Sequence, residues 1–297
     1  MSLLPFETCR QRIARAEAHC KTLATLWNEA IEEGDLYSTR LDIQDDGTGS
    51  IWIAPRFERG LPDVFSLEFG EFLYQLRSAL DACVYAAAVV ESGQDPPPNE
   101  EDLEFPICDS AAKFKKASWK IRPLAKKRRD IIESVQPYNA PSLDNNLLVM
   151  NPHRALAILN DWARKDRHRR LHIVGGWASS ANPQLWLPRG VELEYMMVTY
   201  DGLLEHDSEI ASFKLRGYVP GAEPKVQANP DVFVDIAVDE PPPMCADNDT
   251  LGERTKWMII YVRAIVREIE ASFSEYPPRV ADIDDVASHS SHETPLQ

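Results

Sequence analysis

The segment PDVFSLEFGEFLYQLRSALDACVYAAAVV, residues 62–90, predicts the central helix of the fold. Its apolar side chains recur at three- and four-residue spacing, which gathers them on one wide stripe of an α-helix. The stripe consists of Phe65, Phe69, Phe72, Leu73, Leu76, Leu80, Cys83, Val84 and Ala87. A stripe of this width needs several packing partners, so we expect the helix to lie at the centre of a bundle.

Helical spacing recurs on both sides of this segment. Pro152 follows Asn151 at an early helical position, where the N–H that proline lacks has no intrahelical partner. Residues 92–104, with three consecutive prolines, predict a loop or linker. The further predicted helices are residues 8–33, 111–120, 123–135, 152–171 and 250–273. They predict a bundle of about five helices built around 62–90 and 152–171, which 250–273 closes.

Two regions change to the two-residue alternation that is typical of strands. Residues 41–57 alternate around an Asp-Asp-Gly-Thr-Gly turn, which indicates a hairpin. Strand-like segments without intervening helices follow at residues 172–179, 184–187, 191–200, 208–219 and 231–238. Such consecutive strands predict an antiparallel meander over residues 172–239. The predicted fold class is therefore α+β, a helical bundle flanked by an antiparallel sheet made of this meander and the hairpin.

The length of 297 residues, 44% of them hydrophobic, allows one large domain, which we assign to residues 1–276. Residues 277–297 are polar without periodicity and predict a disordered tail. No apolar run approaches the roughly 20 residues that span a bilayer. Residues 1–10 also lack the layout of a signal peptide. We therefore expect a cytoplasmic protein with no membrane partner.

Charge is distributed unevenly along the chain. The net charge of −15 argues against broad binding to nucleic acids or anionic membranes. Residues 113–170 nevertheless contain 15 Lys and Arg against five acidic residues, a net charge of +10, which leaves −25 for the rest. This basic segment suits a phosphate-bearing partner such as RNA. It also suits a solvated helix face that pairs with the acidic surface of the protein itself.

The densest basic stretch contains the candidate anion-binding residues. These are Lys126, Lys127, Arg128 and Arg129, preceded by Lys113, Lys115, Lys116, Lys120 and Arg122. Phe114 and Trp119 are interleaved with them and could stack on bases.

A candidate polar network lies on the two most buried predicted helices. Arg77 and Asp81 are four residues apart beside the apolar stripe, and a buried charge is costly unless it is paired. Asp166 and Arg169 continue the inward stripe of the helix at 152–171. We expect Arg77 to pair with Asp166 and Asp81 to pair with Arg169. Such a network either fixes the helix register or forms a preorganised polar site.

The end of this helix contains the candidate catalytic residues. His168 and His172 lie on one helix face, but no third ligand is identified and the surrounding cations make a poor metal site. We therefore predict neither a metal nor a cofactor. The cations suit an anion, with His168 or His172 as the proton donor or acceptor and Arg167 or Arg169 stabilising phosphate charge. This is ribonuclease-type chemistry without a metal.

Four short motifs follow one another between residues 62 and 175. They are R-S-A-L-D at 77–81, F-P-I at 105–107, Q-P-Y at 136–138 and D-R-H-R at 166–169. In this order they resemble a group of uncharacterised bacterial and phage proteins, which show R-S-A-L-D-H, F-P-I, Q-P-Y and a D-K-H-R helix end followed by strands. The resemblance implies no activity, because the group has no established function.

The R-S-A-L-D-H segment of that group also has the R-x4-H form of the HEPN ribonucleases, helical-bundle proteins of toxin and phage-defence systems. Here Ala82 occupies the histidine position, so this match is broken. Arg167 and His172 satisfy the same form. Residues five apart lie about 140° apart around an ideal helix, so both could face one site only if the helix unwinds after Arg169.

The sequence thus supports two functions. The first is binding of RNA or another phosphate-bearing ligand through the 113–170 surface, with metal-independent cleavage as an extension. The second is a non-enzymatic protein-interaction module in which Arg77, Asp81, Asp166 and Arg169 are structural. The oligomeric state stays open.

Overall fold

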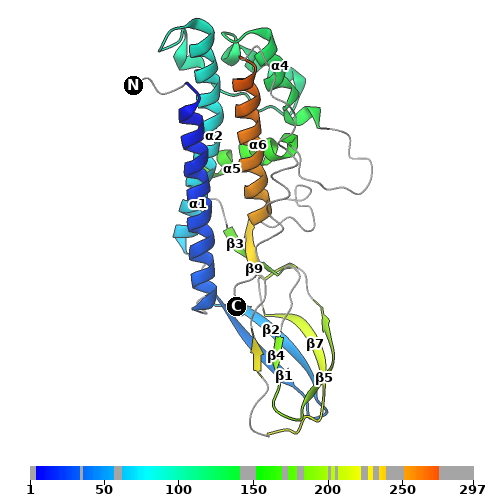
Figure 1. The fold of residues 1–297 in the computed structure, drawn as a ribbon. Helices are drawn as coiled ribbons and strands as arrows, with labels where there is room; N and C mark the ends of the chain where they lie inside the picture. Colours follow the sequence, from blue (N-terminus) through cyan, green and yellow to red (C-terminus); the bar gives the residue numbers. More distant parts are fainter. Residues whose placement is uncertain are drawn as a thin grey trace.

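A computed structural model describes most of the chain. The described residues are 5–33, 36–56, 62–140, 152–168, 173–178, 184–199, 202–204, 207–221, 227–229, 234–238 and 251–273. Within these ranges there are six α-helices and nine strands. Figure 1 shows the long helices side by side at one end and the largest sheet at the other. The predicted fold class, a helical bundle flanked by an antiparallel sheet, is confirmed.

Four helices form the bundle. They are α1 (Glu7–Glu32), α2 (Asp63–Ser92), α5 (Pro152–His168) and α6 (Leu251–Ala271). Helix α2 packs against the other three, as its wide stripe predicted. All nine stripe residues are buried, and Gly93 ends the helix in the left-handed conformation (φ 65°) that favours glycine. Among the described residues, no helix combines the length and hydrophobicity that crossing a membrane requires.

Short helices cover the upper end of the bundle (Figure 1). They are η1 (Glu100–Asp102), α3 (Ala111–Ala117), η2 (Ser118–Ile121), α4 (Lys126–Ser134) and η3 (Pro137–Asn139). The segment predicted as one helix at 111–120 changes from α to 3-10 geometry at Ser118. The predicted loop at 92–104 contains η1.

The largest sheet has four antiparallel strands in the order β1-β2-β7-β5. They are β1 (Tyr37–Ile43), β2 (Thr48–Pro55), β5 (Glu192–Val198) and β7 (Ser208–Arg216). A three-stranded sheet contains β3 (Ile173–Ala178), β6 (Gly202–Leu203) and β9 (Val234–Val238). The remaining pair is β4 (Gln184–Trp186) and β8 (Gln227–Asn229).

The order of these strands differs from the meander that the sequence predicted. The C-terminal strands β3, β4 and β5 pair with later strands rather than with one another, and the N-terminal hairpin joins the sheet through β7. The turn residues in the sequence correctly indicated where strands end. The strand with which each one pairs depends instead on packing between distant segments. Ile51 of β2, for example, is buried opposite Ala211 of β7.

Gly49 provides a test of the β2–β7 contact. A Cβ at this position would lie 2.5 Å from the ring of Phe213 and 2.7 Å from the backbone oxygen of Asp42. Because backbone cannot easily move away, we expect Gly49→Ala to destabilise the protein by about 1–3 kcal/mol. Gly221→Ala is the control, since Gly221 has open space around it and only the cost of its positive φ applies. Urea denaturation measures both, and equal losses would contradict the packing described.

Candidate functional site

Arg77 is a buried cation whose side chain forms a hydrogen bond to the main chain. Its Nη2 donates to the carbonyl oxygen of Phe105 at 2.7 Å and to Oε1 of Glu104 at 2.9 Å, while Nη1 lies 3.0 Å from Oδ1 of Asp81. The same Asp81 oxygen accepts a hydrogen bond from the N–H of Phe105 at 2.9 Å. Burial raises the pKa of Asp81 against the opposing charge of Arg77. Both backbone polar groups of Phe105 are thus satisfied by one side-chain pair on α2.

Gln136 holds the same segment from the other side. Its buried amide nitrogen donates to the carbonyl oxygens of Pro106 and Ile132 at 2.8 and 2.9 Å, and its Oε1 accepts from the N–H of Cys108 at 2.8 Å. Nδ1 of His153 on α5 lies 2.9 Å from the backbone oxygen of Gln136. We call Arg77, Asp81 and Gln136, together with residues 105–108, the backbone clamp. It explains three of the four motifs as parts of one structural unit.

The predicted pairing of Arg77 with Asp166 is wrong. Asp166 faces α2 at Gly70, where an added Cβ would lie 2.9 Å from both carboxylate oxygens. This contact is two helical turns away from Arg77, whose hydrogen bonds are taken by the clamp. Burial and then the negative charge of Glu71 raise the pKa of Asp166. No described cation forms an ion pair with it.

The structure describes little of the predicted catalytic set. Arg167 and His168 form the C-terminal end of α5, and only their backbone is described. Arg169 and His172 lie outside the described residues, so the predicted pairing of Asp81 with Arg169 also stays a prediction. Within the described ranges, no three His, Cys, Asp or Glu side chains converge in a way that could hold a metal ion.

The candidate anion-binding residues do not act as one set. Arg128 forms an ion pair with Glu91 at 3.0 Å, and its guanidinium lies 3.6 Å from the ring centroid of Phe273. Lys127 and Arg128 donate to the carbonyl oxygen of Ser272 at 3.3 and 3.2 Å, just beyond the C-terminal end of α6. Cations are favoured at such an end because its carbonyl groups and helix dipole are negative. These two side chains therefore attach α4 to α6.

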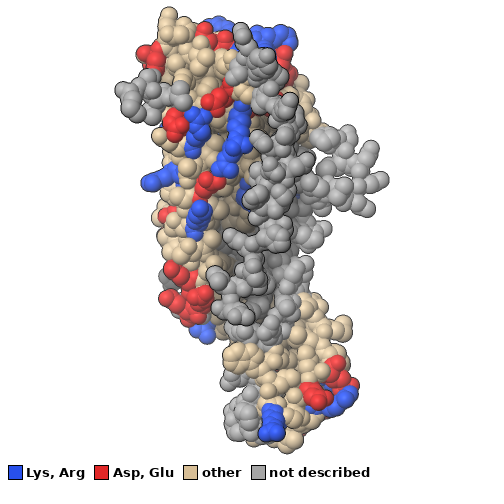
Figure 2. Space-filling model, in the orientation of Figure 1, with Lys and Arg blue, Asp and Glu red and all other residues tan. Residues whose placement is uncertain are grey.

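Other basic residues of the segment pair with acidic neighbours. The pairs are Lys113 with Asp109, Lys120 with Glu104, and Lys126 with Asp130. On the face that Figure 2 shows, acidic and basic side chains both lie over the upper end of the molecule. For Lys126, Lys127 and Arg129, anion binding stays a prediction.

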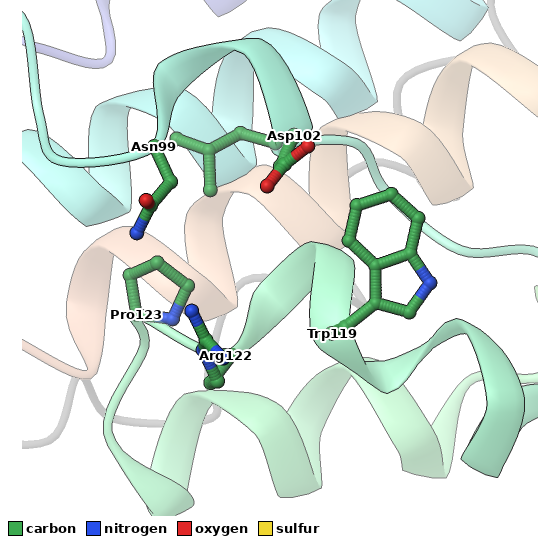
Figure 3. A pocket seen from close by; sticks show the side chains of 6 residues that line it. Asn99, Asp102, Trp119, Arg122 and Pro123 are labelled. Atoms are coloured by element: carbon green, nitrogen blue, oxygen red, sulfur yellow. The ribbon is translucent and has the colours of Figure 1, made fainter.

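A small pocket of about 80 Å³ opens at the same end, between η1 and η2 (Figure 3). Its lining residues are Asn99, Asp102, Leu103, Trp119, Arg122 and Pro123. Trp119 is 50% exposed, and Nζ of Lys120 lies 5.8 Å from its ring centroid. The sequence had already indicated Trp119 and Arg122 as candidate binding residues, because both belong to its densest basic stretch. No pattern distinguished Asn99 and Asp102, which lie in the predicted loop.

Strand β5 forms a second candidate surface, at the opposite end of the molecule (Figure 1). It is an edge strand of the four-stranded sheet. Four of its seven residues are large apolar side chains that are 40–61% exposed: Leu193, Tyr195, Met197 and Val198. The sequence predicted a strand here but not its edge position, on which this exposure depends.

Arg77→Ala tests the backbone clamp. The substitution leaves Asp81 and the carbonyl group of Phe105 without their cation, and breaking a buried pair of this kind costs about 3 kcal/mol or more. Lys126→Ala, which removes the exposed partner of Asp130, should change the free energy of unfolding by less than about 1 kcal/mol. Chemical denaturation of both variants makes the comparison, and a small loss for Arg77→Ala would refute the structural role.

Asp166→Asn tests the unpaired carboxylate. A carboxyl group whose pKa is raised on folding contributes stability that is present at low pH and is lost as the pH rises through its folded pKa. We therefore expect Asp166→Asn to raise the free energy of unfolding at neutral pH, with a gain that shrinks toward about pH 4. A series of urea titrations measures this difference. Destabilisation at neutral pH would mean that a partner satisfies the carboxylate.

Comparisons of the chain with family models, with curated proteins and with solved structures found no match.

Proposed function

We propose that the protein is a cytoplasmic, non-enzymatic interaction module that binds an extended segment of a partner protein along β5. The observation that carries this proposal is an edge strand with apolar side chains on both faces. Exposed edges pair readily with other strands, and proteins commonly protect them with charges, prolines or a cover. An apolar edge is therefore a suitable binding surface for a further strand.

The inner face of the sheet stays apolar up to this edge. Leu193, Met196 and Val198 of β5 lie opposite Leu215, Phe213 and Ala211 of β7. The three β7 residues are buried, whereas Leu193 and Val198 are only about half covered. A strand added beside β5 would extend this apolar face and cover both side chains.

The outer face offers apolar contacts as well. Tyr195 and Met197 lie opposite Lys214 and Ser212 of β7. Met197 is 61% exposed. In strand addition, main-chain hydrogen bonds supply affinity, and alternate side chains supply specificity. Strand β5 can recognise a partner side chain on each face.

The charge of β5 indicates what kind of segment it prefers. Glu192 and Glu194 are exposed beside the apolar residues. Glu194 forms a long ion pair with Arg216 at 3.8 Å, and its side chain is 44% exposed. Opposite charges across a strand pair are favourable and like charges are not. We therefore expect a partner segment that combines apolar residues with Lys or Arg, rather than a second copy of this acidic strand.

The contacts of the backbone clamp support a structural role for the polar network. Arg77, Asp81 and Gln136 each make hydrogen bonds to main-chain groups, which are the bonds that hold an extended segment in place. In this proposal they stabilise the fold and take no part in chemistry.

A phage-displayed library of random ten-residue peptides tests the proposal. Peptides selected on the wild-type protein should bind a Tyr195→Lys/Met197→Lys variant at least about tenfold more weakly, a loss of about 1.4 kcal/mol. The matched control is Leu67→Lys/Tyr74→Lys, which makes the same charge change at exposed positions of α2. Control binding should match the wild type.

Two results would contradict this proposal. One is peptide binding that the β5 variant retains. The other is a dimer, seen by analytical ultracentrifugation, that the β5 variant dissociates, because the strand would then bind a second copy.

A further inference from the structure

Trp119 presents an aromatic surface at the wall of the η1–η2 pocket. Half of this large side chain is exposed, although tryptophan is highly buried on average. Nζ of Lys120 lies 5.8 Å from the ring centroid of Trp119, and the same lysine forms an ion pair with Glu104. The indole therefore has a neighbour on one side whose position is fixed. An exposed indole of this kind is a stacking surface for a planar ligand.

Asp102 and Arg122 place opposite charges in the same pocket without forming an ion pair. Figure 3 shows their side chains approaching from opposite walls, with Trp119 beside them. Neither forms an ion pair with any described residue, whereas Lys113, Lys120, Lys126 and Arg128 in the same basic segment all do. The pocket therefore offers a free acceptor and a free fork of donors to one ligand.

This combination selects among planar ligands. Guanine carries two adjacent donors, N1–H and N2–H₂, that one carboxylate can accept together. It also carries the acceptors O6 and N7, which suit the paired donors of an arginine. Adenine lacks the first arrangement, and uracil lacks the amino group. We propose that the η1–η2 pocket binds a guanine base, with Trp119 stacking on it, Asp102 accepting from its N1 and N2 groups and Arg122 donating to O6 and N7.

The surroundings leave room for the rest of a nucleotide. The pocket itself has a volume of about 80 Å³, which is smaller than sites that enclose a whole ligand, so a base would be held by one face and its edges while the rest of the nucleotide stays outside. A wider, more open hollow of about 330 Å³ adjoins it and shares Asn99, Arg122 and Pro123. The exposed Lys115 and Lys116 of α3 belong to the same basic segment and form no ion pair with a described residue. The guanine belongs either to a free nucleotide or to single-stranded RNA, and this site is independent of β5.

Isothermal titration calorimetry with GMP, AMP, CMP and UMP tests the base. GMP should bind at least tenfold more tightly than the other three. Asp102→Ala should remove this preference, and Trp119→Ala should weaken every nucleotide. Arg40→Ala, which removes an exposed cation of β1 already paired with Asp207, should leave GMP binding unchanged.

Three results would overturn the guanine proposal. Tighter binding of CMP, equal binding of all four nucleotides, or GMP binding that Asp102→Ala retains would each exclude the proposed guanine contacts.

Two uridine octamers, one with a single central guanine, identify the source of the base. Tighter binding of the guanine octamer than of GMP, weakening as salt rises, would assign the site to RNA. Equal affinity for the octamer and GMP would assign it to a free nucleotide. Binding of both octamers alike would overturn the guanine proposal and leave only a sequence-independent contact with phosphates.

Discussion

The buried guanidinium of Arg77 is the constraint around which the upper half of the molecule is organised. A cation inside an apolar helix stripe must have its charge and its donors satisfied. Here Asp81, Glu104 and the carbonyl oxygen of Phe105 meet this requirement. Because one of these partners is main chain, the requirement also determines where the extended segment after η1 lies against α2.

The clamp has a further consequence at the η1–η2 pocket. Glu104, which Arg77 holds, also forms an ion pair with Lys120. Burial alone would raise the pKa of Glu104, but Lys120 and Arg77 keep it below its ordinary value, so the carboxylate stays charged. Asp102 lies two residues before Glu104, and Trp119 lies one residue before Lys120. The same ionic chain that stabilises the fold therefore sets the distance between the two walls of the pocket.

Charged side chains in this protein hold helices against one another as well as interacting with solvent. The basic segment is not one uniform surface, because Lys127 and Arg128 hold α4 at the end of α6 and other cations pair with nearby acids. Among the described residues that line the pocket with Trp119, the cation without an ion pair is Arg122. At the other end of the molecule the available surface is apolar and belongs to β5. The two surfaces differ in chemistry and are suited to different ligands.

The sequence by itself determined which residues form helices and strands, because spacing and turn residues act locally. The stripe of α2, the hairpin at β1 and β2 and the α+β class all followed from it. Tertiary structure alone decided the partners. Arg77 donates to the backbone oxygen of Phe105 and does not pair with Asp166, because a buried donor can be satisfied by any acceptor that packing brings near. Strand β5 is an edge because β7 is the one described strand that pairs with it, while the other side of β7 pairs with β2, more than 150 residues away in the sequence. Asp102 came to face Arg122 through the clamp. Contacts between distant segments depend on the summed packing of the chain, which no local pattern contains.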